Sequence, residues 1–178
     1  MRGYFAVGVD GISKPMNLGN LMRIANAFDA SFFFTIAPQL KLSEARHSDT
    51  SQTQGTLPLY TYRNAEEFRL PLGCRLVGVE ITEDAVELPR FRHPQRAAYV
   101  FGAERHSLSP AILSRCEFVI RIPTKFSINV GMAGAIVLYD RLLSSGKFGD
   151  RPVVPGGKTG AVPPPHTWGA PLARDRRR

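Results

Sequence analysis

The segment NLGNLMRIANAF, from Asn17 to Phe28, carries polar side chains at a regular spacing on a predicted helix. Asn17, Asn20, Arg23 and Asn26 recur every three residues, and apolar residues between them give the helix an amphipathic pattern. Asn17 stands where a side chain can cap the free amides of a helix start. Arg23 stands in the second turn of a predicted helix that leaves the end of a strand, and open α/β sheets bind their ligands at such strand ends. Arg23 is therefore either an exposed structural arginine or a functional group.

A second candidate site follows a strand pattern that ends at Gly102. In VFGAERHSLSP, residues 100–110, the acid Glu104 precedes a helix start marked by Ser109 and Pro110. A glycine at such a strand end permits either the close approach of a ligand or an unusual turn. Glu104 either serves that ligand or only favours the N-terminus of the next helix.

The third candidate site lies in IRIPTKFSINVGMAGAIVLYDRLLSSG, residues 120–146. A strand ends near Pro123, a short polar turn follows, and Ser127 and Asn129 open a long helix that is predicted to end near Ser145. Small residues at the start of this helix let another group approach its backbone. That group is either a packed segment of the chain or a bound ligand.

Short strand patterns alternate with helical patterns along most of the chain. Strands are predicted at residues 4–9, 31–36, 59–62, 75–81, 97–102 and 117–122. Helices are predicted at residues 18–28, from Asn64, from Ser109 and at residues 129–145. This alternation predicts an α/β fold with a mostly parallel sheet flanked by helices.

Charge and composition divide the chain into one domain, residues 1–149, and a tail, residues 150–178. Of the net charge of +8, residues 1–150 contribute +3 (17 basic and 14 acidic groups), and residues 151–178 contribute +5 (six and one). The tail is rich in Pro and Gly and ends in RDRRR, which is typical of a flexible segment. Its charge favours a polyanion such as RNA, or only keeps the chain in solution.

Other features exclude several classes of protein. No window approaches the roughly 18 uninterrupted apolar residues of a membrane helix, and the N-terminus lacks a secretion pattern, so we expect a cytoplasmic protein. Cys74 and Cys116 form neither a CxxC pair nor a disulfide framework, which favours buried thiols. The four histidines lie far apart in the sequence, so no metal site is predicted.

Together, in this order, the three stretches resemble motifs of the SpoU (TrmH-type) branch of the SPOUT RNA methyltransferases, over about residues 4 to 145. The first motif, Asn-x-Gly-x-x-x-Arg, is matched by Asn17, Gly19 and Arg23. The second, Gly-x-Glu, is matched by Gly102 and Glu104. The third, Ile-Pro followed by a loop and Ser-x-Asn-Val, is matched by Ile122, Pro123, Ser127, Asn129 and Val130.

The resemblance implies an RNA methyltransferase that uses S-adenosyl-L-methionine to methylate ribose 2'-hydroxyls, with tRNA favoured over rRNA, and with neither DNA nor a membrane as partner. It implies a homodimer whose active site draws on both subunits, and a C-terminal trefoil knot, although knots are rare among folds. The implied catalytic residues are Asn17, Arg23, Glu104, Ser127 and Asn129. The implied cofactor-binding residues are Glu80, Gly102, Ile122, Ser127, Val130 and Ala133.

Arg23 is the catalytic residue proposed for that family, yet a guanidinium has no acceptor and stays protonated. Held by Glu104, it would clamp the adjacent phosphate and stabilise negative charge on the ribose oxygen, which we favour over a neutral form that accepts the proton. Two features depart from the family pattern: Ser107 replaces a common glycine, and the turn from Pro123 to Ser127 is short. They motivate the alternative of a non-catalytic RNA-binding or assembly protein on the same fold.

Overall fold

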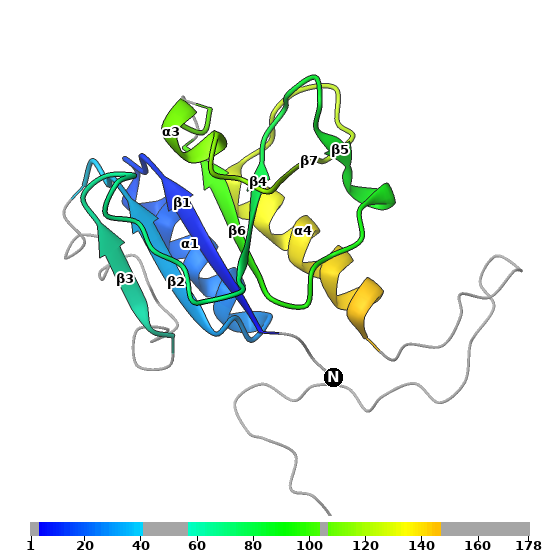
Figure 1. Ribbon diagram of the computed structural model, residues 1–178, viewed down its shortest axis with the longest axis horizontal. Coiled ribbons are helices and arrows are strands. Elements are labelled where there is room, and N and C mark those ends of the chain that lie inside the picture. The colour runs from blue at the N-terminus through cyan, green and yellow to red at the C-terminus, as the bar shows by residue number, and fades with distance from the viewer. Residues whose placement is uncertain (1–3, 41–56, 104–106, 147–178) are drawn as a thin grey trace, which may run out of the picture. The chain divides into compact units, whose positions relative to one another are not determined.

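The fold is a single seven-stranded sheet in which all neighbouring strands run parallel (Figure 1). The computed structural model describes residues 4–40, 57–103 and 107–146, and the statements below concern these ranges. The strand order is β3-β2-β1-β6-β4-β7-β5. The strands are β1 (Phe5–Asp10), β2 (Phe32–Ile36), β3 (Leu59–Tyr62), β4 (Arg75–Val79), β5 (Val86–Glu87), β6 (Ala97–Gly102) and β7 (Phe118–Arg121).

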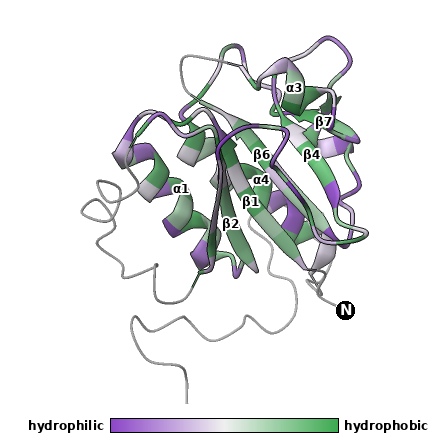
Figure 2. Cartoon of the chain, turned by 60° about the vertical axis from the view of Figure 1, so that its left-hand side comes forward, coloured by the Kyte–Doolittle hydropathy of each residue, from purple (hydrophilic) through white to green (hydrophobic). Residues whose placement is uncertain are grey.

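Two long helices cover one face of the sheet, and short segments cover the other. Helices α1 (Pro15–Ala27) and α4 (Val130–Ser145) pack together on the first face. On the opposite face, Phe68 and α3 (Pro110–Leu113) pack over the sheet, while the 3₁₀ helix η2 (Leu88–Arg90) follows β5. Burial on both sides explains why the central strands read as continuous apolar runs, and Figure 2 shows β1 and β6 as hydrophobic along most of their length.

Residues along β1 alternate between the two faces. Val7 and Val9 belong to the core under α1 and α4, whereas Ala6 belongs to the core that contains Phe34 and Phe68. Gly8 lies opposite Phe34 in the strand register, and a Cβ atom added at Gly8 would lie 2.2 Å from the Phe34 ring. Glycine at this position therefore leaves the space that the Phe34 ring occupies.

The predicted α/β class and the six predicted strands are confirmed to within two residues at each end. The helix predicted from Asn64 is wrong: residues 65–67 form a turn, in which the Asn64 side chain accepts a hydrogen bond from the Glu67 amide at 2.9 Å. The helix predicted from Ser109 is only four residues long, and Ser109 makes no side-chain cap. Strand β5, with two residues, was not predicted.

Two sequence expectations concern the C-terminal part of the chain. The trefoil knot implied by the resemblance stays a prediction. The predicted basic tail lies outside the described residues, which end at Gly146. Within the described ranges, none of the helices has both the length and the apolar character needed to cross a membrane.

Candidate active site

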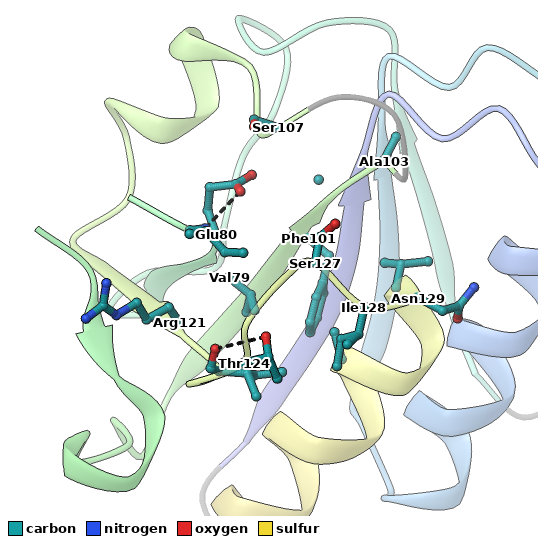
Figure 3. Close-up of a pocket in the computed structure, with 15 residues that line it drawn as sticks. Val79, Glu80, Phe101, Ala103, Ser107, Arg121, Thr124, Ser127, Ile128 and Asn129 are labelled. Atoms are coloured by element: carbon teal, nitrogen blue, oxygen red, sulfur yellow. Dashed lines mark hydrogen bonds between the residues drawn. The ribbon is translucent and has the colours of Figure 1, made fainter. Parts of the chain in front are cut away.

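A cavity of about 470 Å³ opens at the carboxyl ends of β4, β6 and β7, beside the start of α4 (Figure 3). These three strands are neighbours in the sheet although other elements separate them in the sequence, so their terminal loops meet at one edge. Apolar side chains form much of the wall: Val79, Ile81, Phe101, Ile122, Ile128 and Val130. Carboxyl ends of parallel strands are the usual ligand-binding edge of open α/β sheets.

All six residues that the resemblance implies for cofactor binding line this cavity, and they come from four separate elements or loops. Glu80 follows β4, Gly102 ends β6, and Ile122 follows β7. Ser127 precedes α4, while Val130 and Ala133 belong to its first turn, and their small or short side chains leave the helix backbone accessible. The cavity thus collects the second and third sequence motifs at one place.

Glu80 is engaged by backbone amides at the cavity wall. Its Oε1 accepts a hydrogen bond from the Ile81 amide at 2.9 Å, and its Oε2 accepts one from the Leu108 amide at 2.8 Å. In Figure 3 the carboxylate points toward the segment that contains Ser107. A carboxylate has about four acceptor positions, so Glu80 keeps capacity for hydroxyl or ammonium donors.

Asp10 is a site residue that the sequence analysis did not select. It ends β1, lies opposite Gly102 in the strand register, and is only 6% exposed. Its Oδ2 accepts a hydrogen bond from the Ser109 amide at 2.9 Å. Because β1 and β4 flank β6, Asp10 and Glu80 lie on either side of it and accept hydrogen bonds from two consecutive amides, those of Ser109 and Leu108. We call this arrangement the carboxylate clamp. The sequence signal that could have identified Asp10 is an acidic residue at the end of an apolar strand.

Asn17 and Asn129 join the first motif to the third. Asn129 caps α4, because its Oδ1 accepts hydrogen bonds from the amides of Gly131 at 2.9 Å and Met132 at 3.4 Å. Its Nδ2 donates to Oδ1 of Asn17 at 3.3 Å. Of the two roles considered for Asn17, a cap of α1 is not observed, since that helix begins at Pro15 and Asn17 lies buried in its first turn, and its catalytic role stays a prediction. Its side chain instead fixes the orientation of the α4 cap.

Arg23 does not line the cavity. It is exposed on α1 and is not among the residues that line the pocket. Glu104 lies outside the described residues, so its predicted approach to Arg23 stays a prediction. Of the implied catalytic residues, the structure brings together Asn17, Ser127 and Asn129.

The two cysteines are not poised as nucleophiles. Burial raises the pKa of Cys116 to about 11, and burial also raises the pKa of Cys74, so both thiols stay protonated near neutral pH. The Cys116 thiol donates to the Ile112 carbonyl, in keeping with a structural role. Among the described residues, no group of three or more His, Cys, Asp or Glu side chains is placed to hold a metal ion.

A parallel sheet with helices on both faces, and with a cavity at the carboxyl ends of its central strands, defines an α/β protein whose candidate ligand site lies at that edge of the sheet. Comparison with known families makes the assignment specific. The model described as the SpoU rRNA Methylase family matches residues 4–139, and the chain belongs to this family.

Curated relatives are longer than the matched region. The tRNA (guanosine(18)-2'-O)-methyltransferase TARBP1 of Mus musculus is 26% identical over 138 residues, which cover 72% of this chain and 9% of that protein. The 23S rRNA (guanosine-2'-O-)-methyltransferase RlmB of Nitrosomonas europaea is 29% identical over 145 residues, 74% of this chain and 53% of that protein. The chain thus spans about half, or much less, of these relatives.

Solved structures share the fold. The SpoU methyltransferase AviRb from Streptomyces viridochromogenes, solved with the cofactor AdoMet, matches with a TM-score of 0.69 and 22% identity over 82% of this chain and 63% of that one. A structure titled "Structural insights into the 2-OH methylation of C/U34 on tRNA" matches with a TM-score of 0.71 and 20% identity. That match covers 81% of this chain and 97% of the other, so the two domains are similar in extent.

Proposed function

We propose that this protein transfers a methyl group from S-adenosyl-L-methionine to a ribose 2'-hydroxyl of RNA. The observation that carries the proposal is the cavity, which gathers residues of the second and third motifs and is joined to the first motif by the hydrogen bond between Asn17 and Asn129. Membership of the SpoU family supports it, as do relatives named guanosine 2'-O-methyltransferases of tRNA and rRNA.

The cavity suits a nucleoside that carries a charged amino-acid arm. Its volume lies within the range of about 300–1,000 Å³ found for small-molecule sites. Phe101, Val79 and Ile122 offer apolar surface for a purine ring, and Glu80 keeps acceptor capacity for sugar hydroxyls or an ammonium group. The Ser127 hydroxyl has no hydrogen-bond partner in the described part of the chain, so it can bind a ligand. The donor set therefore fits S-adenosyl-L-methionine.

The bound donor would supply an electrophilic methyl group, and the protein would align the ribose oxygen with it. Correct orientation alone lowers such barriers by about 7 to 11 kcal/mol in favourable cases. Asn129 is held by two amides of α4 and by Asn17, so its side chain is fixed before the substrate arrives. Ser127 would orient the donor or the ribose by a hydrogen bond. Arg23 would contact the adjacent phosphate and stabilise negative charge on the oxygen.

A second copy of the chain is part of this proposal, because Arg23 does not line the cavity of its own subunit. Helices α1 and α4 expose four apolar side chains: Met16 (69% exposed), Met132 (62%), Ile136 (40%) and Tyr139 (54%). Arg23 lies on α1, as Met16 does. A homodimer formed through these two helices would bury the four side chains, and would let Arg23 act at the cavity of the other subunit.

The choice of RNA belongs to the proposal as well. tRNA is favoured over rRNA, because the structural neighbour of similar extent has tRNA methylation in its title. We propose that the reaction occurs in the cytoplasm.

Two measurements test the proposed function. Calorimetry should detect saturable binding of S-adenosyl-L-methionine; a protein that binds RNA but not the donor would instead be the non-catalytic alternative. Nucleoside mass spectrometry of RNA from cells lacking the protein should show the loss of one 2'-O-methylated nucleoside. Arg23→Ala should abolish methyl transfer while donor binding persists, and a variant with full activity would remove Arg23 from the mechanism.

A further inference from the structure

Three exposed arginines follow one another at the end of η2 and in the segment that joins η2 to β6: Arg90, Arg92 and Arg96. We call them the arginine strip. None of them forms a salt bridge within the described ranges. Arg63 and Arg75, in contrast, pair with Glu67 at 2.9 Å and with Glu117 at 2.5 Å. The strip is therefore a group of cations without matching acids in the part of the chain that the structure describes.

The backbone under the strip is held by aromatic side chains that point inward. Phe91 contacts the rings of His93 and Phe118, with centroids 5.1 and 5.7 Å away. The His93 ring is buried, with Nδ1 at 2.6 Å from the Tyr99 hydroxyl and Nε2 at 2.9 Å from Oδ2 of Asp140. The backbone of Phe91 itself is extended, and Arg90 and Arg92 on either side of it are exposed.

A buried arginine of α4 fixes the rest of the segment. Arg141 is 4% exposed and donates to the carbonyls of Pro94 at 2.7 Å and Gln95 at 3.0 Å, and to the Tyr99 hydroxyl at 3.2 Å. Its guanidinium also lies over the Phe5 ring, 5.0 Å from the centroid. Its hydrogen-bond partners are neutral, and the nearby carboxylate of Asp140, which bonds to His93, opposes its charge. The backbone that carries the strip is therefore held to the core by α4 and by the aromatic side chains.

The strip starts beside the cavity and leads away from it. Glu87, just before η2, pairs with Arg121, which lines the cavity. From there the segment descends to the start of β6, at the opposite end of the sheet (Figure 1). Six residue steps separate Arg90 from Arg96, which span at most about 20 Å. An extended polyanion with one unit in the cavity could follow this path.

We propose that the arginine strip binds the sugar-phosphate backbone of RNA on one side of the nucleotide that occupies the cavity. This inference rests on the proposed function, because it takes RNA as the substrate. Exposed guanidiniums without acidic partners are well suited to bind phosphates. Such contacts give affinity that is insensitive to sequence and falls steeply with salt.

The test compares two variants of the full-length chain that lose the same charge at different places. Arg90→Gln/Arg92→Gln removes two cations of the strip, and Arg63→Gln/Arg75→Gln removes two cations that pair with Glu67 and Glu117. Binding of unfractionated tRNA is measured by fluorescence anisotropy over a series of salt concentrations. The basic C-terminal segment is present in every variant and so cancels from the comparison.

The strip variant should bind tRNA at least about tenfold more weakly at 0.1 M salt, and its plot of log K against log salt should be shallower by about 1.4 to 1.8, the slope of two phosphate contacts. The control variant should stay within about twofold of the unmodified protein. Equal weakening in both variants, or no weakening in the strip variant, would overturn the proposal.

A parallel titration with S-adenosyl-L-methionine separates this inference from the proposed function. The strip variant should bind the donor as the unmodified protein does, because its side chains do not line the cavity. If the unmodified protein does not bind the donor but its tRNA binding still depends on the strip, the proposed methyltransferase function is refuted and the proposed role of the strip is supported. Normal donor binding with tRNA binding that is independent of the strip would refute the strip alone.

Discussion

Replacing Asp10 tests whether the carboxylate clamp builds the cavity wall. In Asp10→Ala the Ser109 amide loses a carboxylate acceptor that lies 2.9 Å away in a nearly buried position. Hydrogen bonds to charged groups contribute about 1.5 to 3 kcal/mol, so the free energy of unfolding should fall by about that amount. For a chain of this size, about 2 to 4 °C are lost for each kcal/mol, which predicts a melting temperature lower by about 3 to 12 °C.

The donor affinity should change in the same variant, because the released segment carries Ser107, which lines the cavity. Calorimetry should show weaker binding of S-adenosyl-L-methionine to Asp10→Ala than to Asp10→Asn, whose amide oxygen keeps an acceptor in place. Thr35→Val is the matched control for a loss of stability. Thr35 is fully buried in β2 and bonds to Thr61 of β3, near the sheet edge remote from the cavity.

Two results would refute this reasoning. Unchanged stability and unchanged donor affinity in Asp10→Ala would mean that the hydrogen bond to Ser109 contributes nothing. Equal weakening of donor binding in Thr35→Val would mean that affinity follows global stability and not the clamp.

Three further perturbations have defined outcomes. Gly8→Ala should lower the free energy of unfolding by about 1 to 3 kcal/mol in urea titrations, because its Cβ would overlap the buried Phe34 ring, and Phe34→Leu should recover part of that loss. Burial lowers the pKa of His93 below its ordinary value of 6.5, although Asp140 has the opposite effect. As the pH falls, His93 is therefore protonated in the unfolded chain before it is protonated in the folded one. Stability should therefore fall as the pH drops below 6.5, and His93→Gln should flatten that decline. Ile136→Asp should give a monomer in sedimentation, while Leu72→Asp, at a side chain 98% exposed elsewhere, should leave the assembly unchanged.

The sequence predicted most of the sheet because its strands are apolar runs bounded by turn residues, a pattern that burial on both faces requires. It failed for elements whose formation is not decided by the local sequence. Asn64 does accept a capping hydrogen bond, yet no helix follows it, because one cap cannot offset the cost of nucleating a short helix that Pro71 soon interrupts. Strand β5 has only two residues, too few for any periodicity.

The cavity was predicted through three motifs, and its polar supports were only partly found. Asn17 and Asn129 are 112 positions apart, and Asp10 and Ser109 are 99 positions apart. Hydrogen bonds over such separations leave no periodic trace in the sequence. The sequence therefore offered a local helix cap or a catalytic role for Asn17 but not its bond to Asn129, and Asp10 was not selected although it ends an apolar strand.

The position of α4 at the end of the described chain has a consequence for the order of events during synthesis. Ser127, Asn129 and Val130 complete a cavity whose other walls come from β4, β6 and β7. Before these residues leave the ribosome, the growing chain lacks the wall of the cavity that they form. The cavity is therefore complete only after residues 127–133 have been synthesised and α4 has docked beside α1.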